Sequence, residues 1–419
     1  MSKGEKLQSI RGIHDGLPAD VRRWRHVEQA ARKVFARHVF EEVRLPVLES
    51  TDLFVRSIGE ATDIVSKEMY CFVDQGGDSL CLRPEGTAGA VRAYLQAGLT
   101  RAGAQRWFYI GPMFRRERPQ KGRLRQFQQI GVEWLGVSGP VEDVEMLVMA
   151  HDFLVEIGLE KLSIEINSLG CAACRPAYRE KLVAFLSARA DRLCDTCRER
   201  IAKNPMRVLD CKVESCQAML TDAPEMVDHL CGDCTTHFTG VKTGLDALDV
   251  PYRLNARIVR GLDYYNRTAF EIVTDQLGAQ GTVLAGGRYD GLVEELGGPA
   301  TPAIGFAAGI ERLALLLPEI PVASPDVAVV ALGDAVLNWS LALAGKLRGQ
   351  GHAVVHCGGG GAKRQFKVAD REAARFTLVV GEDEMKAGQV TLKRMATGEQ
   401  QTMPLAEAAK MISCRKEMA

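Results

Sequence analysis

The chain has 419 residues, which is enough for two or three domains around a large catalytic one. Lysine and arginine together number 53, and aspartate and glutamate also number 53. Net charge therefore offers no general attraction to nucleic acid, and any such binding needs a local patch. The N-terminus is polar and no window approaches the ~20 apolar residues of a membrane span, so we expect a cytoplasmic protein without a membrane partner.

Residues 1–170 are predicted to combine helices with antiparallel strands. Apolar residues at helical spacing indicate the helices, and the order strand, loop, strand favours an antiparallel sheet over a doubly wound fold. We expect helices at 19–40, 51–59, 85–96 and 142–158, and strands or extended segments at 41–50, 69–74, 80–84, 106–114, 125–136 and 162–170.

This domain is interrupted, not finished, at Cys171. A Cys-rich, helix-biased insertion is predicted for residues 171–242. Antiparallel strand patterns then resume at 252–261, 268–275 and 282–289, and a Gly-spaced turn leading into an apolar helix is expected at 301–320. The sequence thus predicts an α+β catalytic domain, built on an antiparallel sheet from residues 1–170 and 243–320.

Residues 325–419 follow a different pattern, in which strands alternate with helices. This alternation predicts a small α/β domain with largely parallel strands. The expected strands are 326–332, 352–357, 376–381 and 389–394, and the expected helices are 335–350, 362–374 and 405–412.

The most informative segment is the predicted loop between the strands at 106–114 and 125–136. Guanidinium groups suit phosphate oxygens, and several at one site would bind a polyphosphate and spread the charge that develops during its displacement. Phe127, just beyond the loop, is placed to stack under a purine. The alternative is a solvated basic hairpin loop. The basic residues are Arg115, Arg116, Arg118, Lys121, Arg123 and Arg125, with Glu117 the one acid among them.

Four further residues are ambiguous in isolation. Arg312 begins an apolar helix and Arg260 precedes two adjacent tyrosines. Each of these arginines either faces a ligand or has only a structural role. Arg312 would then extend its charged end from a core helix to solvent, and Arg260 would pack on aromatic rings. Glu85 and Glu133 lie at or beside apolar strand patterns, where a buried carboxylate needs a partner. That partner is either a ligand cation or one of the many arginines.

Together these segments resemble a known family. FRRERPQKGRLRQFQQ (114–129) resembles motif 2 of class II aminoacyl-tRNA synthetases, and GFAAGIERLALLL (305–317) resembles their motif 3. RGLDYYNRTAFEI (260–272) and AGGRYDGLVEELGG (285–298) are similar to two segments peculiar to the histidyl-tRNA synthetase family, and LRPEGT and RGIHDGLP fit the same family. The resemblance covers nearly the whole chain. It implies ATP-dependent ligation of histidine to its tRNA through a histidyl-adenylate, with release of AMP and pyrophosphate.

The resemblance also implies a role for each matching residue. The residues expected to bind ATP and its Mg²⁺ are Arg115 at the α-phosphate, Phe127 at adenine, Arg123 and Arg312 at the β- and γ-phosphates, and Glu117 near adenine or the metal. The residues expected to bind histidine are Glu85 and Gln129 at its ammonium group, and Glu133 and Tyr265 at the imidazole nitrogens, with Tyr264 alongside. Arg260 is expected to contact both the histidine carboxylate and the α-phosphate, as a fixed cation that is catalytic together with Arg115.

Partners follow from the same resemblance. Residues 325–419 resemble the anticodon-binding domain shared by several class II enzymes, which implies the tRNA for histidine as a partner. Family members work as homodimers through the catalytic domain, so we expect a homodimer.

Eight of the 12 cysteines lie in the predicted insertion, in closely spaced pairs. Such spacing lets one turn present two thiolates to a tetrahedral ion, so one or two structural Zn²⁺ sites are predicted. Many family members lack these cysteines, and the insertion's role in clasping the tRNA acceptor arm does not need a metal. Reduced thiols in a packed helical insert, or an iron–sulfur cluster, are the alternatives. The pairs are Cys171/Cys174, Cys194/Cys197, Cys211/Cys216 and Cys231/Cys234.

Two other functions were weighed. A regulatory paralogue that partners a histidine-biosynthetic phosphoribosyltransferase usually lacks the C-terminal domain and degrades the catalytic arginines, whereas both are present in this chain. A class II synthetase for proline, threonine or glycine would share the C-terminal domain, but the segments at 260–272 and 285–298 oppose it.

Overall fold

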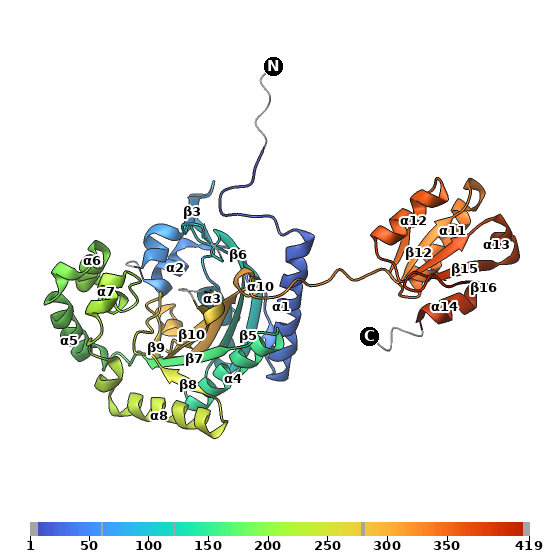
Figure 1. Cartoon of the computed structure of the whole chain (residues 1–419). Helices are drawn as coiled ribbons and strands as arrows, with labels where there is room; N and C mark the ends of the chain where they lie inside the picture. Colours follow the sequence, from blue (N-terminus) through green and yellow to red (C-terminus); the bar gives the residue numbers. More distant parts are fainter. Residues whose placement is uncertain (1–6, 60–61, 121, 278–280, 414–419) are drawn as a thin grey trace, which may run out of the picture. The chain divides into compact units, whose positions relative to one another are not determined.

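The computed structural model describes residues 7–59, 62–120, 122–277 and 281–413. The chain forms two compact units, Met1–Ile320 and Pro321–Ala419 (Figure 1), which are described separately. Within the described ranges, no helix combines the length and the apolar character that crossing a membrane requires.

An eight-stranded sheet with the order β1-β5-β6-β11-β10-β9-β7-β8 is the framework of the first unit. Its two edge strands pair in parallel, β1 with β5 and β8 with β7, and all other neighbours pair antiparallel, which confirms the predicted antiparallel sheet. The strands are β1 (Glu41–Glu42), β5 (Gln105–Phe114), β6 (Gln126–Leu135), β7 (Leu162–Ser168), β8 (Tyr252–Leu254), β9 (Asn266–Thr274), β10 (Thr282–Arg288) and β11 (Ala303–Gly309).

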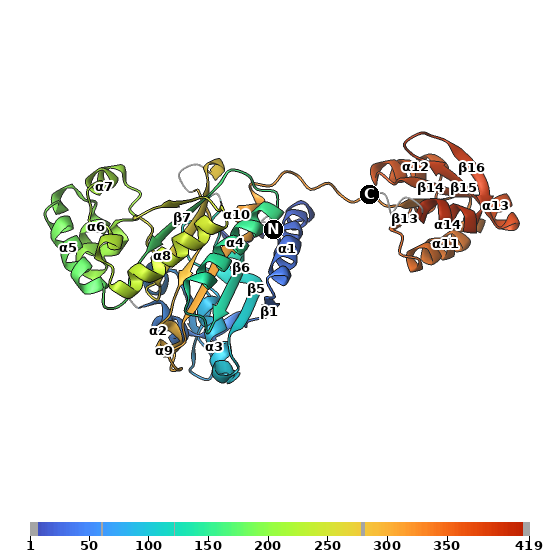
Figure 2. The ribbon, with the colours of Figure 1, turned by 90° about the horizontal axis from the view of Figure 1, so that it is seen from below.

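Side chains alternate between the two faces of this sheet, so one face can be apolar and the other polar. On β6, the side chains of Ile130, Val132 and Trp134 belong to the main core, which they share with α1 (Pro18–Arg37) and α4 (Pro140–Glu156). Helix α8 (Gly232–Ala247) lies beside α4 (Figure 2) and adds to the same core. The odd-numbered side chains of β6 point to the opposite face, where the polar residues of the candidate site gather.

A buried ion network joins these layers. Arg288 on β10 is fully buried and donates from Nε to Asp143 Oδ1 on α4 at 2.7 Å. Its other nitrogens donate to the carbonyls of Val137 and Gly139, and Asp143 Oδ2 lies 2.8 Å from His237 Nε2 on α8. A buried guanidinium paired at every nitrogen fixes the order of sheet and helices.

A smaller antiparallel sheet, β2-β4-β3, covers the site side of the unit together with α2 and α3. It contains the hairpin predicted at 69–84. These elements and the short helices nearby are β2 (Leu48–Ser50), β3 (Tyr70–Val73), β4 (Ser79–Leu82), α2 (Thr51–Ile58), η1 (Ile64–Glu68), α3 (Thr87–Gln96), η2 (Leu99–Arg101), η6 (Asp275–Leu277), α9 (Leu292–Glu295) and α10 (Ile310–Ala314).

Two sequence predictions are wrong in this unit. The segment expected to be a Gly-spaced turn is strand β11, followed by the short helix α10. Its glycines mark close packing instead of a turn, since a Cβ on Gly305 would lie 2.1 Å from Glu133 Oε2. The strand expected over 252–261 is confined to β8 and runs parallel to β7, and the rest of the segment is irregular.

The Cys-rich insertion is helical, as predicted, and α8 carries its last residues back onto the main core. Its elements are α5 (Arg175–Ser187), η3 (Ala190–Arg192), α6 (Asp195–Lys203), η4 (Pro205–Val208), α7 (Glu214–Met219), η5 (Met226–His229) and α8.

The second unit is built on the five-stranded sheet β13-β12-β14-β15-β16. Strands β13, β12 and β14 pair in parallel as expected, but β15 and β16 pair antiparallel, so the sheet is mixed. The elements are β12 (Val327–Ala331), η7 (Asp334–Val336), α11 (Leu337–Gly349), β13 (Val354–His356), α12 (Ala362–Arg371), β14 (Phe376–Val380), α13 (Glu382–Ala387), β15 (Gln389–Arg394), β16 (Gln400–Pro404) and α14 (Leu405–Ser413).

Candidate active site

The carboxyl group of Glu133 on β6 is buried in the first unit and has several hydroxyl partners. Its Oε1 accepts hydrogen bonds from Thr87 Oγ1 at 2.8 Å and from the Tyr109 hydroxyl at 3.0 Å, and its Oε2 accepts one from the Tyr289 hydroxyl. Glu133 is 1% exposed, and burial raises the pKa of its carboxyl group to about 8, although these hydrogen bonds to Tyr289 and Thr87 oppose the shift. The site therefore holds this carboxyl group in place among three hydroxyl groups.

A second buried carboxylate, Glu85, lies in the turn between β4 and α3. Its oxygens accept the backbone N–H groups of Thr87 at 2.6 Å and Ala88 at 2.9 Å, so it caps the N-terminus of α3. Burial raises the pKa of Glu85, while these N–H groups and the charge of Arg115 lower it. Thr87 thus fixes both carboxylates, Glu85 through its backbone and Glu133 through its hydroxyl.

Two adjacent tyrosines pack beside this pair of carboxylates. The rings of Tyr264 and Tyr265 lie 4.7 Å apart, and they approach the ring of Tyr289 at 5.7 and 6.3 Å. Burial raises the pKa of both hydroxyls, and the nearby charge of Glu133 adds to the shift. Both phenols therefore stay protonated at neutral pH and can donate a hydrogen bond.

The guanidinium of Arg260 is held in place beside the cluster formed by Tyr264, Tyr265 and Tyr289. Its guanidinium carbon lies 4.9 Å from the centroid of the Tyr265 ring, and its Nη1 lies 3.3 Å from Glu271 Oε1 on β9. The other oxygen of Glu271 accepts the Thr282 hydroxyl at 2.7 Å. The Arg260 side chain is 15% exposed, so most of the cation is shielded from solvent while one part stays accessible.

The arginine-rich loop between β5 and β6 reaches the same region. Arg115 donates from Nε to the carbonyl of Pro84 at 2.8 Å, which ties the loop to the turn before α3. Glu117 lies between two cations, 3.8 Å from Arg115 and 3.5 Å from Arg123. The guanidinium of Arg115 also lies 5.5 Å from the centroid of the Phe127 ring. The loop therefore presents ordered cations beside an aromatic face instead of a freely solvated charge run.

The last arginine predicted to bind ATP, Arg312, lies on α10. Burial lowers the pKa of Arg312 and the charge of Arg123 lowers it further, while Glu271 opposes this shift. Arg312 lies next to the loop, since a Cβ on Gly122 would come within 3.8 Å of Arg312 Cγ. The predicted ATP residues of the loop are thus neighbours of one another, and contacts also join Glu85 to Glu133 through Thr87 and Arg260 to Tyr265.

Three predicted residues keep a buried polar atom that has no partner among the described residues. These atoms are Gln129 Oε1, the Tyr264 hydroxyl oxygen and Arg260 Nε. Gln129 shares the odd-numbered face of β6 with Phe127 and Glu133. Because buried polar groups are nearly always hydrogen-bonded, the unpaired acceptor on Gln129 and the unpaired donor on Arg260 indicate a ligand that donates a hydrogen bond to the first and accepts one from the second.

Sequence reasoning missed several residues that build the site. Thr87, Tyr109 and Tyr289 hold Glu133, and Glu271 holds Arg260. Tyr289 and Glu271 lie inside the segments quoted for the family, and Glu271 is a charged residue in an apolar strand pattern. Tyr109 carries no such signal, because its role depends on facing Gly131 across the strand pair, where a Cβ would lie 2.1 Å from the Tyr109 ring.

Glu311 is another missed residue. Both of its carboxylate oxygens accept the backbone N–H of Gln128, at 2.8 and 2.9 Å, which fixes the start of β6 against α10. Burial raises the pKa of Glu311 to about 7.

The eight predicted metal-ligating cysteines lie in the insertion and form two separate groups of four. Within each group the sulfurs all lie within 4.8 Å of one another. Burial alone would raise the pKa of the Cys171 thiol, but hydrogen bonds from the backbone N–H groups of Cys174 and Ala173 lower it to about 7. The base group is Cys171, Cys174, Cys231 and Cys234, and the inner group is Cys194, Cys197, Cys211 and Cys216.

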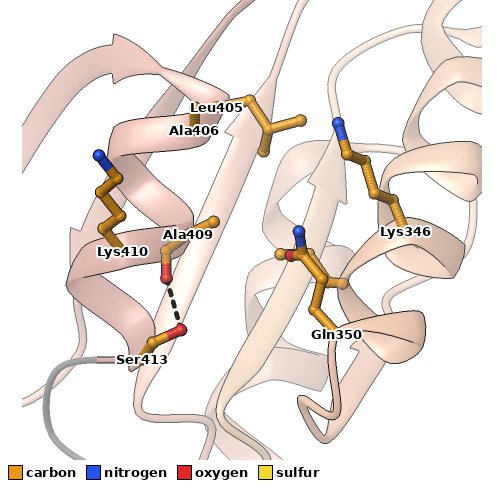
Figure 3. Close-up of a pocket in the computed structure, with 8 residues that line it drawn as sticks. Lys346, Gln350, Leu405, Ala406, Ala409, Lys410 and Ser413 are labelled. Atoms are coloured by element: carbon orange, nitrogen blue, oxygen red, sulfur yellow. Dashed lines mark hydrogen bonds between the residues drawn. The ribbon is translucent and has the colours of Figure 1, made fainter.

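An open hollow of about 530 Å³ lies in the second unit, between α11 and α14 (Figure 3). Lys346, Gln350 and Lys410 line it, and the hydroxyl of Ser413 is already hydrogen-bonded to the Ala409 carbonyl at 3.0 Å. No buried carboxylate or tyrosine cluster faces this hollow among its lining residues, so we place the chemistry in the first unit.

An antiparallel sheet with ordered arginines on a strand-connecting loop and on the helix after a later strand is the arrangement expected of a class II aminoacyl-tRNA synthetase. Comparison with known proteins narrows this class. The profile of the histidyl-tRNA synthetase family matches residues 12–313, and that of the anticodon binding domain matches residues 326–415. The chain therefore belongs to the histidyl-tRNA synthetase family.

Individual relatives are similar to this chain over nearly its whole length. The histidine–tRNA ligase of Trichlorobacter lovleyi is 52% identical over 406 residues, which cover 96% of this chain and 97% of the relative. The histidine–tRNA ligase of Anaeromyxobacter sp. (strain K) is 50% identical over 413 residues, covering 97% and 100%. The crystal structure of apo histidyl-tRNA synthetase from S. aureus superposes with a TM-score of 0.81 at 36% identity, covering 97% of this chain and 100% of that one.

Proposed function

We propose that the site around Glu133 and Arg260 joins histidine to its tRNA through a histidyl-adenylate. The overall activity is that of a histidine–tRNA ligase, which uses ATP and releases AMP and pyrophosphate. The observation that carries the residue-level proposal is that Gln129 Oε1, the Tyr264 hydroxyl oxygen and Arg260 Nε are buried and have no partner among the described residues. These atoms complement the ammonium, the side chain and the carboxylate of an amino acid.

In the first step, the histidine carboxylate attacks the α-phosphate of ATP. Two anions must approach, so positive charge placed in advance matters more than a base. Arg260 is the fixed cation between them, and its pairing with Glu271 keeps it from reorganising during the reaction. Arg115 binds the α-phosphate, and its hydrogen bond to the Pro84 carbonyl fixes its orientation.

The rest of ATP is bound by the arginine-rich loop and α10. Phe127 stacks on adenine beside Arg115, and Arg123 and Arg312 neutralise the β- and γ-phosphates. Glu117 lies between the two loop arginines, where a carboxylate oxygen suits the Mg²⁺ that accompanies ATP. Mg²⁺ would there supply further charge neutralisation on the phosphates.

Histidine is distinguished by its imidazole ring and its ammonium group. Glu133 accepts one imidazole N–H, and Tyr265 contacts the other nitrogen with Tyr264 alongside. Glu85 and Gln129 bind the ammonium, one by charge and the other by its unpaired oxygen. A site built to pair both ring nitrogens rejects isosteres that cannot form these hydrogen bonds.

Pyrophosphate exchange tests the substrate directly. Each of the twenty amino acids is supplied singly with ATP and labelled pyrophosphate. We expect label to enter ATP with histidine alone, because only the imidazole ring pairs with both Glu133 and Tyr265. Exchange with proline, threonine or glycine would assign another class II synthetase. A folded protein that supports no exchange with any amino acid would indicate the regulatory paralogue.

We also propose the functional division expected from the sequence. Residues 1–170 and 243–320 form the catalytic domain, residues 171–242 the insertion, and residues 325–419 the anticodon-binding domain for the tRNA of histidine. The match of residues 326–415 to an anticodon binding domain supports the last assignment. The resemblance further supports a homodimer through the catalytic unit, and exposed Phe72 and Val73 on the small sheet offer apolar surface there. A cytoplasmic location follows from the use of charged tRNA at the ribosome.

Removal of Pro321–Ala419 should separate the two half-reactions. All the proposed ATP and histidine ligands lie in Met1–Ile320, so the truncated chain is expected to keep pyrophosphate exchange within about 3-fold of the full chain. Loss of anticodon contacts should lower kcat/KM for tRNA charging by at least about 100-fold, since each lost phosphate or base contact costs ~1–3 kcal/mol. Charging of tRNA at the full rate by the truncated chain would rule out an anticodon-binding role for residues 321–419.

A further inference from the structure

We propose that the insertion is built around two structural zinc ions, each held by four cysteine thiolates. The base group holds one ion and the inner group holds the other. The metal sites stand independently of the catalytic assignment. Only their effect on histidine binding, argued below, rests on the proposed function.

The sulfurs in both groups are spaced as a tetrahedral ion requires. Cys171 Sγ lies 3.6 Å from Cys174 Sγ and 3.8 Å from Cys231 Sγ, and Cys194 Sγ lies 4.0 Å from Cys211 Sγ. Zn–S bonds of ~2.3 Å in a tetrahedron place the sulfurs ~3.8 Å apart. Disulfides do not explain this geometry, because Cys171 has two sulfur neighbours and a disulfide joins only one, at ~2.05 Å.

Both groups also contain the supporting contacts that thiolates need. The backbone N–H of Cys231 donates to Cys174 Sγ at 3.1 Å, and that of Cys194 donates to Cys216 Sγ at 3.2 Å. In the base group, α5 and α8 begin directly after Cys174 and Cys231, so two helix N-termini lie at one cluster of sulfurs. Backbone donors and helix N-termini offset part of the cost of burying a charged thiolate, and the thiolate is the form that binds metal.

The composition of the insertion core gives a reason for metal. The helices are short, with 9 residues in α6 and 6 in α7. Cysteines occupy core positions that a larger domain would fill with aliphatic side chains, and Cys197 and Cys216 are fully buried. Buried thiols alone add little packing, whereas a bound ion replaces the missing core by cross-linking the segments.

Zinc fits these groups better than other thiolate-bound metals. Four cysteines and no other ligand are typical of structural zinc or of iron–sulfur clusters. An iron–sulfur core of several iron and sulfide atoms pushes its cysteine sulfurs apart, whereas here all four sulfurs of each group lie within 4.8 Å of one another. A single tetrahedral ion fills that space.

The base group lies where the insertion leaves and rejoins the catalytic unit. Cys171 follows β7 closely, and Gly170 and Leu169 are bonded to Arg267 through N–H···O contacts of 2.9 and 2.7 Å. Cys231 lies 60 residues later, at the start of α8. An ion at the base group therefore joins two distant points of the chain at one anchor.

Arg175 connects this anchor to the proposed histidine site. Arg175 directly follows Cys174 of the base group, its Nε donates to the Leu169 carbonyl at 3.2 Å, and its Nη2 donates to the carbonyl of Tyr265. The zinc site at the base group thus positions Tyr265 through Arg175. The inner group has no such contact with Tyr265 in the described structure.

Metal content tests the proposal directly. Protein purified without a metal column or chelator is analysed by inductively coupled plasma mass spectrometry, and we expect two zinc ions per chain. The double variant Cys231→Ser, Cys234→Ser should lose the ion of the base group, and Cys194→Ser, Cys197→Ser should lose that of the inner group. The control Cys71→Ser, an exposed cysteine outside both groups, should keep both ions. Wild-type protein without metal, or with iron in place of zinc, overturns the proposal.

Cobalt replacement keeps the test decisive if a double variant does not fold. Wild-type protein produced with Co²⁺ should show the visible absorption of tetrahedral tetrathiolate cobalt, at two equivalents per chain. An octahedral cobalt spectrum overturns the proposal.

The proposed link between the base group and Tyr265 is tested separately, by the KM for histidine. Loss of the base-group ion should raise KM for histidine about 10-fold with little change in kcat, since a shifted Tyr265 weakens ground-state and transition-state binding alike. Loss of the inner ion should leave this KM unchanged. A base-group variant that loses its zinc but keeps its KM would refute the link while leaving the metal sites intact. Loss of exchange in zinc-replete wild type would instead count against the proposed function.

Discussion

Replacing Arg260 with alanine is expected to lower the rate of histidyl-adenylate formation by about 1,000-fold, as removal of one fixed charge-stabilising donor does in other active sites. The effect should fall on kcat, because Arg260 contacts the reacting carboxylate and phosphate, whose repulsion peaks in the transition state. Arg260→Lys should recover only part of the rate, because an ammonium cannot serve two anions through a planar fork. The measurement is pyrophosphate exchange at saturating histidine and ATP.

Two controls separate catalysis from folding in this test. Arg257 lies on the same irregular segment and is exposed, so Arg257→Ala should leave the exchange rate unchanged. In the Arg260 variant, Glu271 keeps its hydrogen bond from Thr282 and remains partly hydrated, so thermal unfolding should shift little. An Arg260→Ala protein that exchanges pyrophosphate at the wild-type rate would remove this residue from the mechanism.

Local patterns were enough to find the arginine-rich loop and the two strands on either side of it. The alternation along β6 also places Phe127, Gln129 and Glu133 on one face, a consequence of strand geometry alone. Local patterns could not predict which side chains from other elements reach the site. Tyr109 reaches Glu133 only because Gly131 leaves room across the strand pair, and such a fit depends on register.

The wrong predictions arise for the same reason, because local patterns do not show tertiary contacts. Glycines at 305 and 309 indicated a turn, because local propensity treats glycine as a turn former. In the fold, Gly305 instead lets the backbone of β11 pass Glu133 at close range. The cysteine spacing likewise gave the pairs but not their combination, since pairs at 171–174 and 231–234 meet only after the insertion folds back onto the sheet. Tertiary contacts decided each of these points.

Replacing Glu133 with glutamine is expected to raise KM for histidine by about 100-fold, since a hydrogen bond to a charged group contributes roughly 1.5–3 kcal/mol. Glutamine keeps the shape of the side chain but places an NH₂ group where a carboxylate oxygen accepted a hydrogen bond from the imidazole N–H. KM for ATP should not change, because the imidazole lies away from the phosphates. Glu294→Gln, an exposed change of the same kind on α9, is the matched control.

The pH dependence of the same variant provides an independent test. Burial raises the pKa of Glu133 to about 8 in the free enzyme, so near neutral pH the carboxyl group must lose a proton before it can accept the imidazole N–H. KM for histidine in the wild type should therefore fall as pH rises toward this pKa and level off above it, when the group is ionised without histidine. Glutamine cannot ionise, so the variant should lack this dependence. A wild-type KM that does not change through this range would mean that Glu133 is already ionised, and that its hydrogen bonds to Tyr289, Thr87 and Tyr109 outweigh the cost of burial.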